Sequence, residues 1–151
     1  MKLSKDLAVV YGINPTKAVI RLRKASVKNL IVLNTKFNSR IKAIISEAES
    51  HQIKISYEEK NYFKEHFESL NHQGIAILCE KRQEEEESLL EELLNKQDLL
   101  LLILDHLTDP HNVGACMRSA AAANADAVIV PKNRACHLNP TARKVSSGGS
   151  E

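Results

Sequence analysis

The segment from Leu99 to Val130 most constrains the fold of this 151-residue chain. It contains an apolar run, LLLLIL, a polar loop, DHLTDPHN, an alanine-rich stretch and a second apolar run, AVIV. Short apolar runs bounded by polar residues are typical of strands buried on both faces, and a helix between two such strands makes a βαβ unit. Because ligands bind where loops leave the carboxyl ends of parallel strands, we expect function to lie in the loop from Asp105 to Asn112.

A helix is predicted to begin near Pro110, because the amide hydrogen that proline lacks would have no intrahelical partner there. Gly114 can let another backbone or a ligand approach closely, and Arg118 lies four residues further along the same helical face. We therefore expect Asn112, Gly114 and Arg118 to cluster near one end of the helix.

The front half of the chain alternates helix and strand patterns. Asn14 followed by Pro15 predicts a helix start, with Ala18, Val19 and Leu22 on the apolar face. The pattern then predicts a strand at 31–33, a helix at 41–51, a strand at 53–55, a helix at 58–67 and a strand at 75–79. These elements together indicate a small α/β module.

The run QEEEE at 83–87 marks a junction, because consecutive like charges repel and favour solvent. Ser88 followed by Glu91 makes a capping box, so a helix is expected to restart there. The predicted organisation is a first domain over 1–80, an acidic linker over 81–87 and a second domain over 88–151.

Charge differs between the two halves of the chain. Residues 1–83 carry 15 Lys or Arg against 8 Asp or Glu, whereas residues 84–151 carry 6 against 11. The first 45 residues hold ten basic side chains and one acidic one, which suits binding to phosphate backbones; a solvated lysine-rich surface is the alternative. An aromatic content of 4% without tryptophan argues against base stacking as the main mode of RNA recognition.

The sequence also argues against a membrane span, a metal site and a disulfide. No apolar run approaches the ~18 residues of a membrane span, and the N-terminal apolar stretch is too short for a secretory signal, so a cytoplasmic location is expected. Cys79, Cys116 and Cys136 lack paired metal-ligand spacing and are expected to be buried reduced thiols rather than a disulfide, metal site or nucleophile. The histidines show no zinc-like spacing, and no metal is expected.

Two segments of the chain closely resemble the SpoU or TrmH family (SPOUT class) of RNA ribose 2′-O-methyltransferases. They are LLILDHLTDPHNVGACMRSAAAANADAVIVPK and the later NPTARKVSSGGSE. The resemblance implies an α/β fold: a small L30e-like RNA-binding domain followed by the first part of a SPOUT-type (α/β knot) methyltransferase domain. The turn that ends in Gly148, Gly149 and Glu151 matches a small-residue turn of the family. Asn124 stands where the family commonly has glycine, but asparagine also tolerates the left-handed cap.

The resemblance implies three catalytic residues, Asn112, Arg118 and Glu151. Arg118 would stabilise the negative charge that develops on the ribose oxygen, since a guanidinium with a pKa of roughly 13 does not readily act as a base. Asn112 would orient Arg118 or the ribose, and Glu151 would hold the loop or the arginine. The alternative is that Arg118 is an exposed helix residue paired with Asp109 or Asp126.

A second group of residues is implied in RNA binding: Tyr11, Gly12, His72, Gln73 and Gly74. The HQG wording at 72–74 is shared with family members, where it belongs to the RNA-gripping module. From the residues alone, the trio is equally a tight turn with exposed polar side chains.

The implied function is S-adenosylmethionine-dependent 2′-O-methylation of a ribose in large-subunit ribosomal RNA, by likeness that of a guanosine. The family's cofactor-binding loops are expected beyond Glu151, so this chain by itself is expected to be inactive, and its back half to be incomplete with exposed strand edges. The full-length form is expected to be a homodimer without a metal or a membrane segment. The alternative is a non-catalytic RNA-binding module with a remnant methyltransferase segment.

Overall fold

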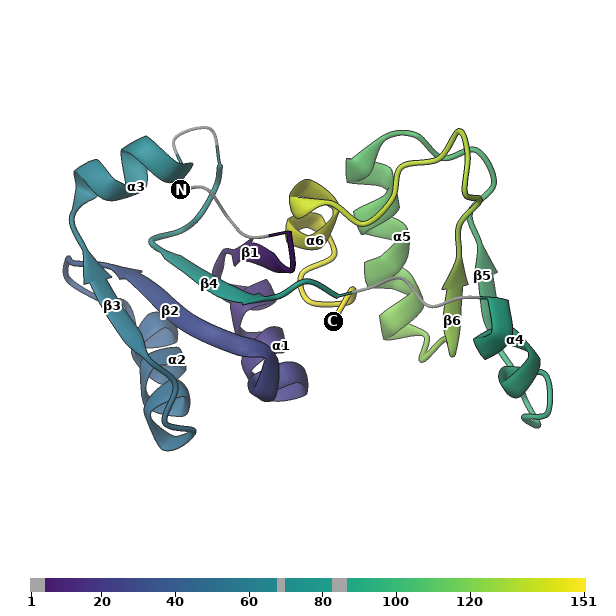
Figure 1. The fold of residues 1–151 in the computed structure, drawn as a ribbon, viewed down its shortest axis with the longest axis horizontal. Helices are drawn as coiled ribbons and strands as arrows, with labels where there is room; N and C mark the ends of the chain where they lie inside the picture. The colour runs from purple at the N-terminus through teal and green to yellow at the C-terminus, as the bar shows by residue number, and fades with distance from the viewer. Residues whose placement is uncertain (1–4, 68–69, 83–86) are drawn as a thin grey trace. The chain divides into compact units, whose positions relative to one another are not determined.

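The computed structural model describes residues 5–67, 70–82 and 87–151, which divide into two compact units (Figure 1). The first unit comprises Met1–Lys81 together with Glu151, and the second comprises Arg82–Ser150. The strands are β1 (Leu7–Tyr11), β2 (Val27–Leu33), β3 (Ile55–Glu58), β4 (Ile75–Glu80), β5 (Leu101–Ile103) and β6 (Ala127–Ile129). The helices are α1 (Ile13–Arg23), a 3-10 turn η1 (Lys24–Ser26), α2 (Ser39–Ser50), α3 (Lys60–Phe67), α4 (Glu87–Leu93), α5 (Pro110–Ala122) and α6 (Pro140–Val145).

The first unit is built on a four-stranded sheet in the order β1-β4-β2-β3. β4 is antiparallel to both of its neighbours, and β2 and β3 are parallel. β1, β2 and β3 therefore run in one direction. Their carboxyl ends lie at the same end of the sheet as the start of β4. α1 and α2 cover one face and α3 covers the other, so the central strands β2 and β4 are buried on both sides (Figure 1).

The predicted start of the first helix is wrong. α1 begins at Ile13, so Asn14 and Pro15 both lie inside its first turn, where proline is tolerated because the amides there have no intrahelical partner. Leu22 is also misplaced by the prediction, since it is 66% exposed. The buried stripe of α1 instead consists of Ile13, Pro15, Thr16, Val19 and Ile20.

Two strands of the first unit depart from the predicted pattern. β1 was not predicted, because its stability comes from pairing with β4, some 70 residues away in sequence. β3 begins at Ile55 rather than at 53, because its residues pair in register with the carboxyl half of β2 up to Glu58. α3 consequently begins at Lys60, two residues later than predicted.

The second unit contains the predicted βαβ arrangement, with β5 and β6 parallel and joined through α5. The prediction that these strands are buried on both faces is wrong. Leu102 and Leu104 pack into the core with Val113, whereas Ile103, which points to the opposite face, is 65% exposed. A sheet of two strands covered by α5 on one side leaves its other side open.

The end of α5 follows the predicted left-handed cap. Asn124 has φ 55°, and the Ala125 amide donates to the Ala120 carbonyl oxygen at 2.9 Å, as in a Schellman motif. Most of the predicted acidic linker lies outside the described residues, which omit 83–86. The predicted Ser88 cap also lies outside the description, because the side chains of 87–89 are not described. None of the helices in the described ranges combines the length and apolar character that crossing a bilayer requires.

Candidate active site and RNA-binding edge

The loop that follows β5 leads directly into α5. The Asp109 carboxylate accepts a hydrogen bond from the His111 amide at 3.0 Å, and Pro110 occupies the first turn. The Cys136 amide donates to the Leu107 carbonyl oxygen at 2.8 Å, which ties this loop to the segment after β6. A side-chain cap followed by proline favours a helix start, and the predicted boundary near Pro110 is confirmed.

Gly114 allows α6 to pack against α5 at very short range. A Cβ atom at Gly114 would lie 2.5 Å from the Ala142 carbonyl oxygen and 2.7 Å from the Val145 Cβ. α6 is itself started by Asn139, whose side chain accepts from the Ala142 amide at 2.9 Å. The close approach that the glycine permits is therefore that of another helix.

The turn that follows α6 lies against α5 beside Arg118. A Cβ atom at Gly149 would lie 2.9 Å from the Met117 carbonyl oxygen and 3.1 Å from the Arg118 Cα. The turn is closed by a hydrogen bond from the Gly149 amide to the Ser146 carbonyl oxygen at 3.0 Å and by one between the Ser146 and Ser150 hydroxyls, also 3.0 Å. Backbone contacts thus fix this turn next to the Arg118 backbone.

The side chain of Arg118 is exposed, and within the described ranges its guanidinium makes no hydrogen bond or ion pair. The two acids considered as its partners are bound elsewhere. Asp109 caps α5, and the Asp126 carboxylate is bound by the Lys96 ammonium and by the Leu100 amide at 3.0 Å. The positive charge of Arg118 is therefore open to a ligand.

The two cations of α6 differ from Arg118 in their surroundings. Arg143 is only 4% exposed, and burial lowers the pKa of Lys144. Both lie in the last turn of α6, where helix carbonyl groups favour positive charge. Arg143 is thus buried and Lys144 is partly buried, whereas the side chain of Arg118 is exposed to solvent.

Asn112 stands apart from the other two residues of the predicted cluster. It is exposed in the first turn of α5, about 9 Å along the helix axis and roughly 120° around it from Arg118. The structure brings Gly114 and Arg118 against α6 and its turn, and leaves Asn112 in solvent. No hydrogen bond joins the Asn112 and Arg118 side chains among the residues described.

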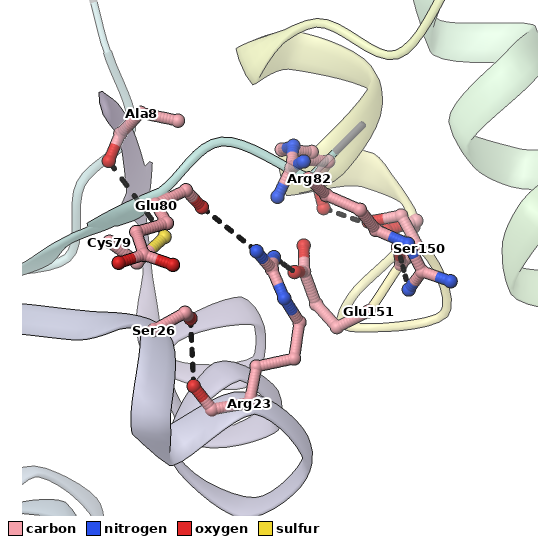
Figure 2. Close-up of polar contacts among 10 residues, drawn as sticks. Ala8, Arg23, Ser26, Cys79, Glu80, Arg82, Ser150 and Glu151 are labelled. Carbon is pink, nitrogen blue, oxygen red and sulfur yellow. Dashed lines mark hydrogen bonds and ion pairs between the residues drawn. The ribbon is translucent and has the colours of Figure 1, made fainter. Parts of the chain in front are cut away.

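Glu151 is bound to a different arginine from the one predicted. Figure 2 shows the Arg23 guanidinium donating to the Glu151 carboxylate at 2.7 Å and to the Glu80 carbonyl oxygen at 2.8 Å. The same view shows Arg82 donating to the Ser150 carbonyl oxygen at 3.1 Å. The Glu151 side chain is buried, and both residues of this ion pair belong to the first unit.

The five residues predicted to contact RNA lie together at the end of the sheet where β1 finishes and β4 begins. The Gln73 side-chain oxygen accepts from the Ile13 amide at 3.1 Å and so caps α1. The Gly12 amide donates to the Ile75 carbonyl oxygen at 3.0 Å. These bonds join the loop before β4 to the junction between β1 and α1.

His72 and Tyr11 are also held by the fold. The His72 Nδ1 accepts from the Gly74 amide at 2.9 Å, and the His72 ring packs 4.8 Å from that of Phe63. Tyr11 is buried. Gly74 has φ 79°, a backbone conformation that glycine adopts readily. These contacts support the interpretation of the HQG wording as a turn, and contact with RNA stays a prediction.

The part of the chain that the structure describes contains no candidate metal site: no group of three or more His, Cys, Asp or Glu side chains there could hold an ion. The three cysteines are free thiols, as predicted. Cys79 is buried, but Cys116 and Cys136 are only partly so, which corrects the expectation that all three are buried.

Comparison with known families accounts for both units. Residues 9–85 match the family described as RNA 2'-O ribose methyltransferase substrate binding, and residues 99–151 match the SpoU rRNA Methylase family. The first of these matches covers more than half of the chain, so the chain belongs to the RNA 2'-O ribose methyltransferase substrate binding family. The resemblance identified in the sequence is confirmed.

Curated relatives are identical to the chain at more than a third of the aligned positions. The 23S rRNA (guanosine-2'-O-)-methyltransferase RlmB of Pseudomonas syringae pv. tomato is 35% identical over 148 residues, which are 97% of this chain and 59% of that protein. RlmB of Escherichia coli (strain K12) is 37% identical over 144 residues, 95% of this chain and 59% of that protein. The chain therefore spans about 59% of the length of these relatives.

Solved structures of the family have the same fold. The SpoU methyltransferase AviRb from Streptomyces viridochromogenes, in complex with the cofactor AdoMet, aligns with a TM-score of 0.73 and 18% identity over 95% of this chain and 52% of its own. A putative RNA methyltransferase of the TrmH family from Porphyromonas gingivalis gives 0.69 and 18% over 97% of this chain and 52% of its own. These matches confirm the predicted α/β SpoU/TrmH fold class.

One element beside Arg118 was missed by the sequence analysis. α6 begins at Asn139 and Pro140, the same cap-then-proline signal that misled the prediction at Asn14 and Pro15. The signal was therefore present at α6, but the short helix has no apolar periodicity to accompany it.

Proposed function

We propose that this chain comprises the RNA-binding domain and the first part of the catalytic domain of an S-adenosylmethionine-dependent RNA ribose 2′-O-methyltransferase. The proposed substrate is a guanosine in large-subunit ribosomal RNA, which the printed names of the RlmB relatives support. The observation that carries the proposal is the exposed Arg118, which has no polar partner among the described residues and is held beside the turn after α6, in a segment that matches the SpoU rRNA Methylase family.

The two units have different proposed tasks. We assign RNA-substrate binding to residues 1–80, a linking role to the acidic segment 81–87, and the first part of the methyltransferase domain to residues 88–151. The match of the substrate-binding family to 9–85 and of the methylase family to 99–151 supports this division.

Arg118 is the proposed catalytic residue. Methylation of a ribose hydroxyl requires its oxygen to lose a proton as it attacks, so negative charge develops on that oxygen. A fixed guanidinium stabilises such a charge, and it remains protonated because its pKa is roughly 13. In this proposal the proton passes to a nearby phosphate or to water.

Asn112 and Glu151 are proposed as positioning residues. Asn112 is exposed at the start of α5, where its amide can orient the ribose. Glu151 directly follows the turn that contacts the Arg118 backbone, and its proposed task is to hold the end of that turn. Proposed RNA contacts are Tyr11, Gly12, His72, Gln73 and Gly74, which share one edge of the first unit.

The proposed methyl donor is S-adenosylmethionine, the cofactor that the AviRb structure contains. The described loops that follow β5 and β6 do not by themselves fit it, because the Cys136 amide donates to the Leu107 carbonyl oxygen and so joins the two loops. We place the cofactor contacts in the part of the relatives' length that this chain does not span, and we derive no step through the cofactor.

The proposed partner is ribosomal RNA, and the proposed assembly of the full-length protein is a homodimer in the cytoplasm. Light scattering coupled to size-exclusion chromatography of the full-length gene product tests the assembly, and a monomeric mass would contradict it.

The decisive test compares Arg118→Ala with Arg118→Lys in the full-length protein. Loss of the guanidinium is expected to lower kcat by about 10²- to 10³-fold, as for loss of a preorganised electrostatic donor, with RNA affinity unchanged. Lysine should restore part of the rate because it keeps the charge. Methyl incorporation into ribosomal RNA is the measurement.

Ser119→Ala is the matched control, since Ser119 is exposed on the same helix and its hydroxyl donates to the Ala115 carbonyl oxygen at 3.1 Å. Its turnover should match that of the unaltered protein. Full turnover of Arg118→Ala would remove the catalytic assignment.

A further inference from the structure

A hollow of about 350 Å³ lies between α1 and α2 of the first unit. Three cationic side chains line it: Lys17 and Arg21 from α1, and Arg40 from α2. One carboxylate, that of Glu47, also lines it. The remaining lining residues are polar at the helix starts and apolar along the floor: Asn14, Ser39, Ile13, Ala43 and Ile44.

Helix periodicity accounts for the cations on these walls. Lys17 and Arg21 are four residues apart and lie on one face of α1, away from its buried stripe. Arg40 and Glu47 lie seven residues apart, and so share one face of α2. The packing of these two helices on the same face of the sheet therefore brings the charged rows together.

Charge in the hollow is only partly compensated. The Arg21 Nε donates to the Glu47 carboxylate at 2.9 Å across the two helices. Lys17 and Arg40 are exposed and make no ion pair with any other described residue. The hollow therefore has an excess of positive charge along an apolar floor, a combination that suits the alternating phosphates and sugars of a nucleic-acid backbone.

The hollow opens near the edge where the proposed RNA contacts gather. Its lining includes the first turns of α1 and α2, and these helices follow the carboxyl ends of β1 and β2. One amide in the first turn of each helix is capped: that of Ile13 by Gln73 at 3.1 Å, and that of Ile41 by Asn38 at 2.9 Å. The cationic side chains add the net positive charge that attracts an anion.

We propose that the hollow between α1 and α2 seats the phosphodiester backbone of the RNA substrate. The inference rests on the proposed RNA-methylating function and adds a location to it: Lys17 and Arg40 bind phosphate oxygens, and Arg21 does so in competition with Glu47. Contacts of this kind orient the RNA without reading its bases.

The test measures binding of the 151-residue chain to a 23S rRNA transcript at several salt concentrations. The triple variant Lys17→Gln, Arg21→Gln, Arg40→Gln is expected to lower the slope of log affinity against log salt by about 2 to 3, since each phosphate contact contributes about 0.7 to 0.9. Affinity at about 0.1 M salt should fall by about 10- to 100-fold.

The matched control carries the same change of charge elsewhere on the unit, through Lys28→Gln, Lys54→Gln and Lys64→Gln. Lys28 lies at the amino end of β2 and Lys54 directly before β3, at the opposite end of these strands from the helix starts, and Lys64 lies on α3, which covers the other face. The control should change the slope by less than about 1. Circular dichroism melts of both variants establish that each is folded.

Glu47→Gln provides a test in the opposite direction. Removal of the competing carboxylate frees Arg21 and is expected to tighten RNA binding by about 2- to 5-fold. Equal losses in the two triple variants, an unchanged slope in the hollow variant, or no gain from Glu47→Gln would overturn the proposed seat. If the unaltered chain does not bind the transcript, the proposed RNA-binding function fails together with the seat. If the unaltered chain binds but the hollow variant behaves like the control, only the proposed seat fails.

Discussion

The two units bury their strands to different degrees, although both strand sets are made of similar apolar runs. In the first unit, residues such as Leu30 and Ile77 are fully buried between helices on both faces of a four-stranded sheet. In the second unit, the sheet has two strands and Ile103 is 65% exposed. An apolar run thus predicts a strand, but the number of neighbouring elements decides how much of that strand is buried.

The largest expected effect in this comparison is that of Phe63→Ala in the first unit. Phe63 is 1% exposed and packs against Phe67, so its truncation leaves a cavity and should lower the free energy of unfolding by about 3–5 kcal/mol. Urea denaturation with amide hydrogen exchange on first-unit residues measures the loss. Tyr57→Ala, at a half-exposed aromatic, is the control and should cost far less.

A smaller loss is expected for Gly114→Ala in the second unit. The added methyl group would overlap the Ala142 carbonyl oxygen at 2.5 Å, and separation of α5 from α6 should cost about 1–3 kcal/mol. Hydrogen exchange of α6 amides is the readout, with Ser119→Ala as the control on the same helix. Unchanged protection would show that the helix contact does not stabilise this unit.

A pH effect separates the units further. Hydrogen bonds from Lys96 and from the Leu100 amide hold the pKa of Asp126 below its ordinary value. The stabilisation is therefore complete above the unfolded-state pKa, about 4, and is lost as pH falls through the lower folded-state pKa. Asp126→Asn should flatten this acid sensitivity in second-unit amides only.

Glu80→Gln is the counterpart in the first unit, because a hydrogen bond from Lys28 similarly lowers the pKa of Glu80. It should flatten the acid response of first-unit amides. If either substitution altered both units alike, the units would not unfold separately.

The smallest expected effect is that of Ile103→Ser. Because the side chain already faces water, the free energy of unfolding should change by no more than about 0.5 kcal/mol. Leu104→Ser, one residue on and buried in the core, should be strongly destabilising in the same denaturation experiment. Similar losses for the two substitutions would mean that the open side of the sheet is covered in solution.

Local signals explain which parts of the fold were predictable. The start of α5 at Pro110 and the left-handed Asn124 each depend on a few adjacent residues, and both agree with the structure. β1 and the exposure of Leu22 depend on which elements pack together, and periodicity alone does not contain that information.

The candidate site divides in the same way. The neighbourhood of Gly114 and Arg118 could be predicted, because helix spacing places them on one face. The pairing of Glu151 with Arg23 joins residues 128 positions apart, and no local pattern specifies it. The roles of Asn112, Arg118 and Glu151 in catalysis remain predictions that substitution can test.

The glycine contacts on α5 have a mechanical consequence. A Cβ atom at Gly114 would lie 2.5 Å from the Ala142 carbonyl oxygen and one at Gly149 would lie 2.9 Å from the Met117 carbonyl oxygen, so α5 and the 140–150 segment have little room to move relative to each other. A molecule that displaced the 146–150 turn would therefore also displace the part of α5 that carries Arg118.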